Sequence, residues 1–175
     1  MRRAGFPHRF VVIVATAATL GACTSSPIPD GYTGPIASVT DSMTQRSATS
    51  VDIFYLAKID GRSIDESLSA TRSRNYGRGF AMDPVIVSRD VPAREETFTI
   101  VGRTDYAAPI LALVNKVYEV SGETRFAPEP NKAYMVRGTL GDEGSAVWIE
   151  ERDSGKLVGR KIEVKGGSTL GFFEK

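Results

Sequence analysis

The side chains that most often carry out chemistry in proteins are nearly missing from this chain. Its single cysteine, Cys23, and its single histidine, His8, both lie close to its beginning. Serine–histidine–aspartate hydrolysis, cysteine–histidine catalysis and the usual zinc sites all need imidazole or thiol groups. Downstream of Cys23, only carboxylates, lysine, tyrosine and serine are left for catalysis. We therefore expect no catalytic residues, no metal ligands and no cofactor, and a protein that is not an enzyme.

Cys23 follows a stretch with the composition of an export signal. Residues 1–9 carry three arginines, and residues 10–20 form an apolar run far shorter than the roughly 20 residues of a membrane-spanning helix. Gly21 and Ala22 are the small residues that export peptidases require before the cleavage point. We predict cleavage before Cys23 and attachment of lipid to its sulfur. The alternative is an ordinary secretory signal that leaves a free thiol, which is an oxidation liability in an exported protein.

The segment Leu20-Gly21-Ala22-Cys23 resembles the lipobox of Gram-negative envelope lipoproteins. In that family, aspartate directly after the modified cysteine marks retention at the inner membrane. Thr24 is not aspartate, so the resemblance implies an outer-membrane protein that is anchored by lipid and faces the periplasm. Two or three acyl chains bind a bilayer stably, so palmitate and the other chains of a triacylated cysteine need no further anchor.

The composition divides the chain into three parts. Residues 1–22 are the predicted signal peptide, and residues 23–35 are rich in Ser, Pro and Gly, which predicts a flexible tether after the lipidated cysteine. Fully extended, such a tether reaches about 40 Å, although part of it, such as Tyr32, could pack on the domain. Residues 36–175 form one predicted domain.

The net charge is close to zero. Removal of the leader with its three arginines leaves 19 of the 22 basic residues against 21 acidic ones. A chain with so little net charge has no strong field for nucleic acid, so we expect no nucleic-acid partner.

The most unusual local composition is an arginine-rich segment with interleaved aromatic residues. It contains Arg72, Arg74, Tyr76, Arg78 and Phe80. In a cytosolic protein this pattern favours RNA binding, but an exported protein meets little nucleic acid. Guanidinium groups also bind phosphates and carboxylates with two parallel hydrogen bonds. We therefore take these five residues as the candidate site for an envelope partner; the alternative is a solvated loop between strands.

The acidic residues give a weaker signal. Asp60, Asp65 and Glu66 could surround a cation, but their spacing does not match the calcium-binding loop. The other acids occur as adjacent pairs, which point to opposite faces of a strand and make poor glycosidase dyads unless folding brings distant carboxylates together. A carboxylate-dependent glycan hydrolase is therefore only an alternative function.

Alternating apolar residues and turn signals predict a chain built from short strands. In residues 51–59 the odd-numbered positions are apolar, which predicts a half-buried strand. Ser63 and Glu66 have the spacing of a capping box, so residues 63–75 are expected to be irregular or a short helix. Further strands are expected over 85–91 and 96–103, which a hairpin would join, over a long stretch from Pro109 to Val120, and over 133–140, 145–152 and 158–164.

This pattern predicts an all-β fold, a single antiparallel β-sandwich of about seven or eight strands, with a small β-barrel as the alternative. The segments Ile59-Asp60-Gly61, Phe126-Ala127-Pro128, Tyr134-Met135-Val136 and Trp148-Ile149-Glu150 resemble small β-sandwich lipoproteins of unknown function. That resemblance implies no particular site. The expected function is that of a non-enzymatic, outer-membrane-anchored lipoprotein whose periplasmic domain binds a protein or glycan. The alternative is an accessory subunit of an envelope transport or secretion complex.

Overall fold

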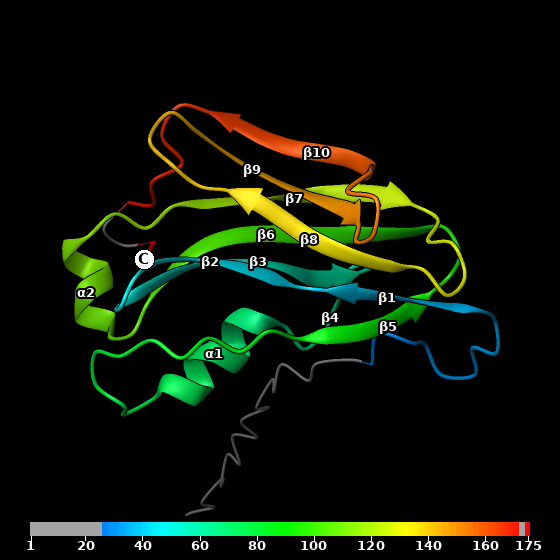
Figure 1. The fold of residues 1–175 in the computed structure, drawn as a ribbon, viewed down its shortest axis with the longest axis horizontal. Helices are drawn as coiled ribbons and strands as arrows, with labels where there is room; N and C mark the ends of the chain where they lie inside the picture. Colours follow the sequence, from blue (N-terminus) through cyan, green and yellow to red (C-terminus); the bar gives the residue numbers. More distant parts are fainter. Residues whose placement is uncertain (1–25, 172–173) are drawn as a thin grey trace, which may run out of the picture.

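A computed structural model describes residues 26–171 and 174–175 of the chain. Two five-stranded sheets pack against each other (Figure 1). The first sheet has the strand order β10-β9-β8-β1-β5, and the second has the order β2-β3-β6-β7, with β4 paired to β3. The prediction of an all-β sandwich is confirmed. The closed barrel named as its alternative is wrong for the described residues, because their strands form two separate sheets.

The part of the chain that the structure describes contains ten strands, whereas seven or eight were expected. The first sheet contains β1 (Ile36–Thr40), β5 (Ser88–Pro92), β8 (Ala133–Thr139), β9 (Gly144–Glu151) and β10 (Leu157–Lys165). The second contains β2 (Ser42–Ser47), β3 (Ser50–Ile59), β4 (Arg62–Ser63), β6 (Glu96–Tyr106) and β7 (Glu119–Phe126). The described residues also form two short helices, α1 (Ser67–Asn75) and α2 (Pro109–Val114).

The hairpins near the end of the chain form as predicted. Strand β9 pairs antiparallel with β8 on one side and with β10 on the other. The turn before β10 contains Gly155, whose φ of 67° lies in the left-handed region that glycine adopts without strain. Strand β9 therefore lies inside its sheet, as its apolar residues on both faces indicate.

Two strand connections differ from the prediction. The expected hairpin between residues 85–91 and 96–103 is wrong, because β5 pairs with β1 in the first sheet while β6 pairs with β3 and β7 in the second. The chain crosses from one sheet to the other at Ala93–Glu95. In addition, β1 pairs parallel with β8, so the sandwich is not purely antiparallel.

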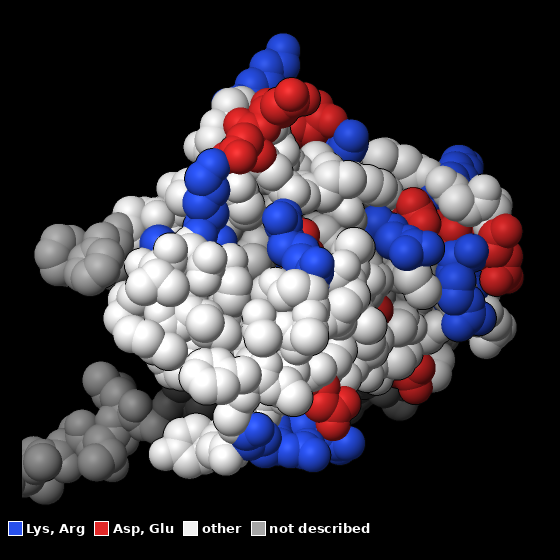
Figure 2. All heavy atoms as spheres, turned by 60° about the vertical axis from the view of Figure 1, so that its left-hand side comes forward, with Lys and Arg blue, Asp and Glu red and all other residues white. Residues whose placement is uncertain are grey.

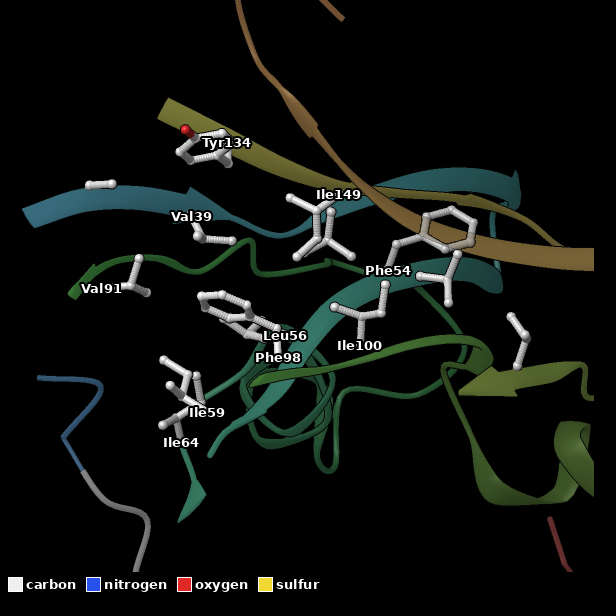
Figure 3. Close-up of a cluster of buried hydrophobic side chains, with 14 residues drawn as sticks. Val39, Phe54, Leu56, Ile59, Ile64, Val91, Phe98, Ile100, Tyr134 and Ile149 are labelled. Carbon is white, nitrogen blue, oxygen red and sulfur yellow. The ribbon is translucent and has the colours of Figure 1, made fainter. Parts of the chain in front are cut away.

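The main core fills the space between the sheets. Its largest members include Phe54, Leu56, Phe98 and Ile149, each at most 2% exposed (Figure 3). The Phe98 ring lies 4.9 Å from the ring of Phe126, centroid to centroid. Burial of such large side chains supplies the main free energy of folding.

Strand β3 is buried on both faces, not on one as predicted. Its outward residues, Val51, Ile53 and Tyr55, form a second apolar cluster with Leu68 of α1. Helix α1 therefore covers the outer face of the second sheet. A register shift between Leu56 and Lys58 then turns Ile59 into the main core, because one extra residue reverses the face to which later side chains point.

Residues 26–35, part of the predicted tether, contact the domain at the Ile59 end of β3. The carbonyl oxygen of Ser26 accepts a hydrogen bond of 3.0 Å from Arg62 Nη1. Tyr32 is half-buried, and its ring centroid lies 5.2 Å from the guanidinium carbon of Arg94. These contacts shorten the free length of chain that precedes the domain.

Candidate functional site

The arginine-rich segment forms the end of α1 and the turn after it. Helix α1 begins after Glu66, whose carboxylate accepts a hydrogen bond of 3.0 Å from the Ser69 amide. A carboxylate at this position satisfies amides that lack partners within the helix. The predicted capping residue Ser63 is wrong: it belongs to β4, and Glu66 is the N-cap.

Polar side chains of α1 fix the extended segment that follows the turn. Three side chains on one face of the helix accept hydrogen bonds from backbone amides of this segment. Ser67 Oγ accepts from Val87 at 2.8 Å, Thr71 Oγ1 from Val85 at 2.9 Å, and Asn75 Oδ1 from Asp83 at 2.9 Å. Residues four apart on a helix are neighbours, so three helical side chains match alternate residues of the extended segment. This explains why the strand expected from Val85 starts only at Ser88.

The three arginines of the candidate site all bind carboxylates of this chain. Arg72 donates from Nε and Nη2 to one oxygen of Asp105, at 3.0 and 2.7 Å. Arg74 and Arg78 share Asp83, at 2.8 and 3.3 Å. The carboxyl side chain of Asp105 is only 9% exposed, so Arg72 neutralises a nearly buried charge. Part of the hydrogen-bonding capacity of these three guanidinium groups is therefore taken up by carboxylates of the same domain.

The aromatic residues of the candidate site point to solvent. Tyr76 is 91% exposed and Phe80 is 60% exposed. Large apolar side chains exposed together often mark an interaction surface. Of the five predicted partner-binding residues, these two have the most free surface, and their partner-binding role stays a prediction.

Helix α2 adds exposed apolar residues at the same end of the sandwich. Its sequence, Pro109-Ile-Leu-Ala-Leu-Val114, has no charged residue and no buried one. Ile110, Leu113 and Val114 lie on one helical face and are 55%, 42% and 72% exposed. We call Tyr76, Phe80 and α2 together the α2 end.

The strand predicted from Pro109 to Val120 is wrong. The chain forms α2, then β7 from Glu119. Alternating apolar residues fit both structures in so short a segment, and Pro109 is placed at the start of a helix, where its missing amide costs nothing. The signal that identifies α2 is this proline followed by good helix formers.

A pocket of about 530 Å³ lies at the α2 end, between α1 and α2. The turn after α1 forms one wall, and the end of β6 together with α2 forms the other. Arg72, Tyr76 and Leu113 line it. Figure 2 brings this end forward and shows a broad surface of uncharged residues with charged side chains at its borders. Pockets of this size and apolar character are typical of ligand sites.

Asp105 is the one acidic side chain that lines this pocket, and Arg72 binds it. Glycoside hydrolysis by the usual mechanism needs two carboxyl groups that flank the substrate. This pocket therefore does not offer that arrangement.

Among the described residues, no group of three or more metal-binding side chains occurs, and no described helix is long and apolar enough to span a bilayer.

A different carboxyl group, Glu96, is expected to make the stability of the domain depend on pH. Burial raises the pKa of Glu96, and neighbouring Asp60 raises it further, while Arg94 opposes this. A raised folded-state pKa means that the folded protein holds the proton to higher pH than the unfolded chain. As the pH rises above the reference value of 4.5, the contribution of Glu96 to stability therefore falls.

We expect the variant Glu96→Gln to lose this pH dependence. The free energy of unfolding of the wild type, minus that of the variant, should decrease from pH 4.5 toward neutrality, by at most about 1.4 kcal/mol per pH unit for one proton. Urea unfolding at several pH values measures this difference. The exposed neighbour Glu95 supplies the control, because Glu95→Gln should leave the slope unchanged. Equal slopes for the wild type and Glu96→Gln would contradict the assignment.

Cys23 and the rest of the predicted lipobox lie outside the described residues. Lipidation therefore stays a prediction from the sequence.

The chain was compared with models of known protein families, with curated proteins and with solved structures. None of the three comparisons gives a match.

Proposed function

We propose that this protein is a lipid-anchored lipoprotein of the outer membrane whose periplasmic β-sandwich binds an envelope partner, protein or glycan, and catalyses no reaction. The sequence around Cys23 supports the anchor, and Thr24 supports the outer membrane. The observation that carries the binding role is the α2 end, where five large apolar side chains are at least 42% exposed. They are Tyr76, Phe80, Ile110, Leu113 and Val114.

The contacts of residue 26 support a defined orientation of the anchored domain. Only residues 24 and 25 separate Cys23 from Ser26, which is bound to Arg62, so these two points are at most about 11 Å apart. Arg62 follows the Ile59 end of β3, whereas the α2 end lies beyond its Ser50 end, where Ser50 pairs with Tyr106.

A ten-residue strand is about 33 Å long. The α2 end therefore projects away from the anchor, as the separation of α2 from the blue N-terminal segment in Figure 1 illustrates. Because the α2 end points away from the membrane that holds the anchor, its exposed apolar residues are better placed to contact a partner in the periplasm than the bilayer itself.

Metabolic labelling with palmitate tests the anchor. We expect the wild-type protein to incorporate label and Cys23→Ala to incorporate none, because the chain contains no other thiol. Thr24→Ala serves as the matched control and should be labelled like the wild type. Equal labelling of wild type and Cys23→Ala would refute the anchor.

Membrane fractionation tests the location in the same strains. The family rule implies that Thr24→Asp keeps the label and moves the protein to the inner-membrane fraction. If wild type and Thr24→Asp both remained in the inner-membrane fraction, the outer-membrane assignment would be wrong.

A further inference from the structure

The pocket at the α2 end is lined by two kinds of residue, apolar and cationic. Met82, Pro109, Ala112 and Leu113 supply apolar surface, and Met82 also packs against the second apolar cluster of the domain. Because Met82 is anchored there, its part of the lining is a fixed part of the fold. Leu113 remains 42% exposed, so apolar surface is available to a ligand.

The polar side of the pocket is rich in cations. Arg72, Arg103 and Lys175 line it together with one acidic side chain, Asp105. Lys175 Nζ donates to the carbonyl oxygen of Asn115 at 2.7 Å. Asp105 binds Arg72 and Glu119 binds Arg103, so the three cations face two carboxylates, and this excess of one positive charge favours an anionic group in the pocket.

Both guanidinium groups keep donors that no hydrogen bond uses among the described residues. Arg72 directs Nε and Nη2 to the same oxygen of Asp105, which leaves Nη1. Arg103 donates from Nη1 to Glu119, and its Nε is buried without a partner. Free guanidinium donors bind carboxylate and phosphate oxygens through charge-assisted hydrogen bonds.

We propose that this pocket binds a single-chain anionic amphiphile, a fatty-acid-like molecule. Its acidic head lies by Arg72 and Arg103, and its chain lies along Met82 and Leu113. The size of the pocket, about 530 Å³, is that of a site for one small ligand. The inference goes beyond the proposed function, because it adds a small ligand inside the pocket to a partner on the surface around it. The two sites share Tyr76 and Leu113, which line the pocket and are also exposed.

Photolabelling of the full chain in phosphatidylcholine vesicles tests the proposal. The probe is dodecanoic acid with a diazirine on its chain, and the comparison probe is the trimethylammonium analogue of the same length. Mass spectrometry of peptides locates the label. We expect the acid to label the peptides that contain Met82 and residues 109–114, and the cationic probe to label them about tenfold less, the factor that 1.4 kcal/mol represents.

Two variants with matched exposure control for nonspecific binding. Leu113 is 42% exposed in the pocket and Leu157 is 43% exposed on β10. Leu113→Asp should lower the labelling by the acid about tenfold, since it removes apolar contact and places a charge against the chain of the ligand. Leu157→Asp should not change it. Neither exposed position should affect folding, which circular dichroism verifies.

Other outcomes overturn the proposal. Equal labelling by both probes, or equal effects of Leu113→Asp and Leu157→Asp, would show nonspecific partitioning. If only a diazirine-bearing phosphatidylglycerol in the vesicles labelled these peptides, the site would bind a membrane surface instead of a free amphiphile. The result is independent of the anchor test, because an unlipidated chain presents the same pocket to the added probe.

Discussion

Replacing Asp41 by alanine is expected to lower the free energy of unfolding by about 3–5 kcal/mol, the cost of removing one partner from a buried ion pair. Asp41 and Arg89 form a bidentate pair, with distances of 2.7 and 2.6 Å, and their side chains are 0% and 5% exposed. Alanine would leave the guanidinium of Arg89 buried without its counter-charge. A buried, unpaired charge is among the costliest single defects in a fold.

The carboxylate of Asp41 also connects elements that are distant in sequence. It accepts hydrogen bonds from the Leu56 amide of β3 at 3.0 Å and from the Ser67 amide and hydroxyl of α1 at 3.0 and 2.7 Å. Arg89 belongs to β5 in the other sheet. One carboxylate therefore joins both sheets and the helix that begins the candidate site, and its loss leaves buried donors unsatisfied.

Urea unfolding of wild type and variants measures this effect. The control is Asp90→Ala, an exposed neighbour of Arg89 on β5, which should change stability by less than about 0.5 kcal/mol. In the double variant Asp41→Ala/Arg89→Ala, the loss should be smaller than the sum of the single losses, because the second change removes the unpaired charge. A loss below about 1 kcal/mol for Asp41→Ala would contradict this role.

The sequence predicts those parts of the fold that depend on local patterns. The hairpins around residues 141–144 and 153–156 follow from turn residues between alternating segments, and they form. The two faces of β3 show where local pattern fails. The alternation of Val51, Ile53 and Tyr55 predicts one buried face correctly, and α1 covers that face. Burial of the other face, which carries Phe54 and Leu56, depends on the first sheet, and no local pattern reveals it.

The candidate site shows the same division. The composition of residues 72–80 identifies an unusual segment, and the exposure of Tyr76 and Phe80 agrees with a surface role. The partner of Arg72, however, is Asp105, 33 residues further along the chain. No spacing rule predicts such a pair, since it follows from the packing of α1 beside the end of β6. Apolar periodicity alone does not predict α2, because over six residues it does not distinguish a helix from a strand.

A second large effect is expected at Gly138, where the two sheets are in close contact. An ideally placed Cβ on this residue would overlap the ring of Phe54 and would lie 2.5 Å from the carbonyl oxygen of Ala146. Phe54 is 2% exposed in the main core, and Ala146 belongs to the paired strand β9. Neither the ring nor the backbone has free space into which it could move, because cores are close-packed.

Gly138→Ala should therefore lower the free energy of unfolding by about 3 kcal/mol, at the upper end of the usual cost of overpacking. Gly141→Ala is the matched control in the same hairpin, because its Cβ would meet nothing closer than Gly144 O at 3.7 Å. That change should alter stability by no more than about 0.5 kcal/mol. Similar unfolding midpoints for the two variants would contradict close contact between the sheets at this position.

The double variant Gly138→Ala/Phe54→Leu separates the two causes of the expected loss. Leucine lacks the ring atoms that the new methyl group overlaps, so it should recover part of the stability that Gly138→Ala loses, although Phe54→Leu alone is destabilising. Recovery should be incomplete, since the contact with the Ala146 carbonyl remains. If the two losses simply added, the ring of Phe54 would not be what prevents a side chain at position 138, and the clash with the β9 backbone would account for the whole effect.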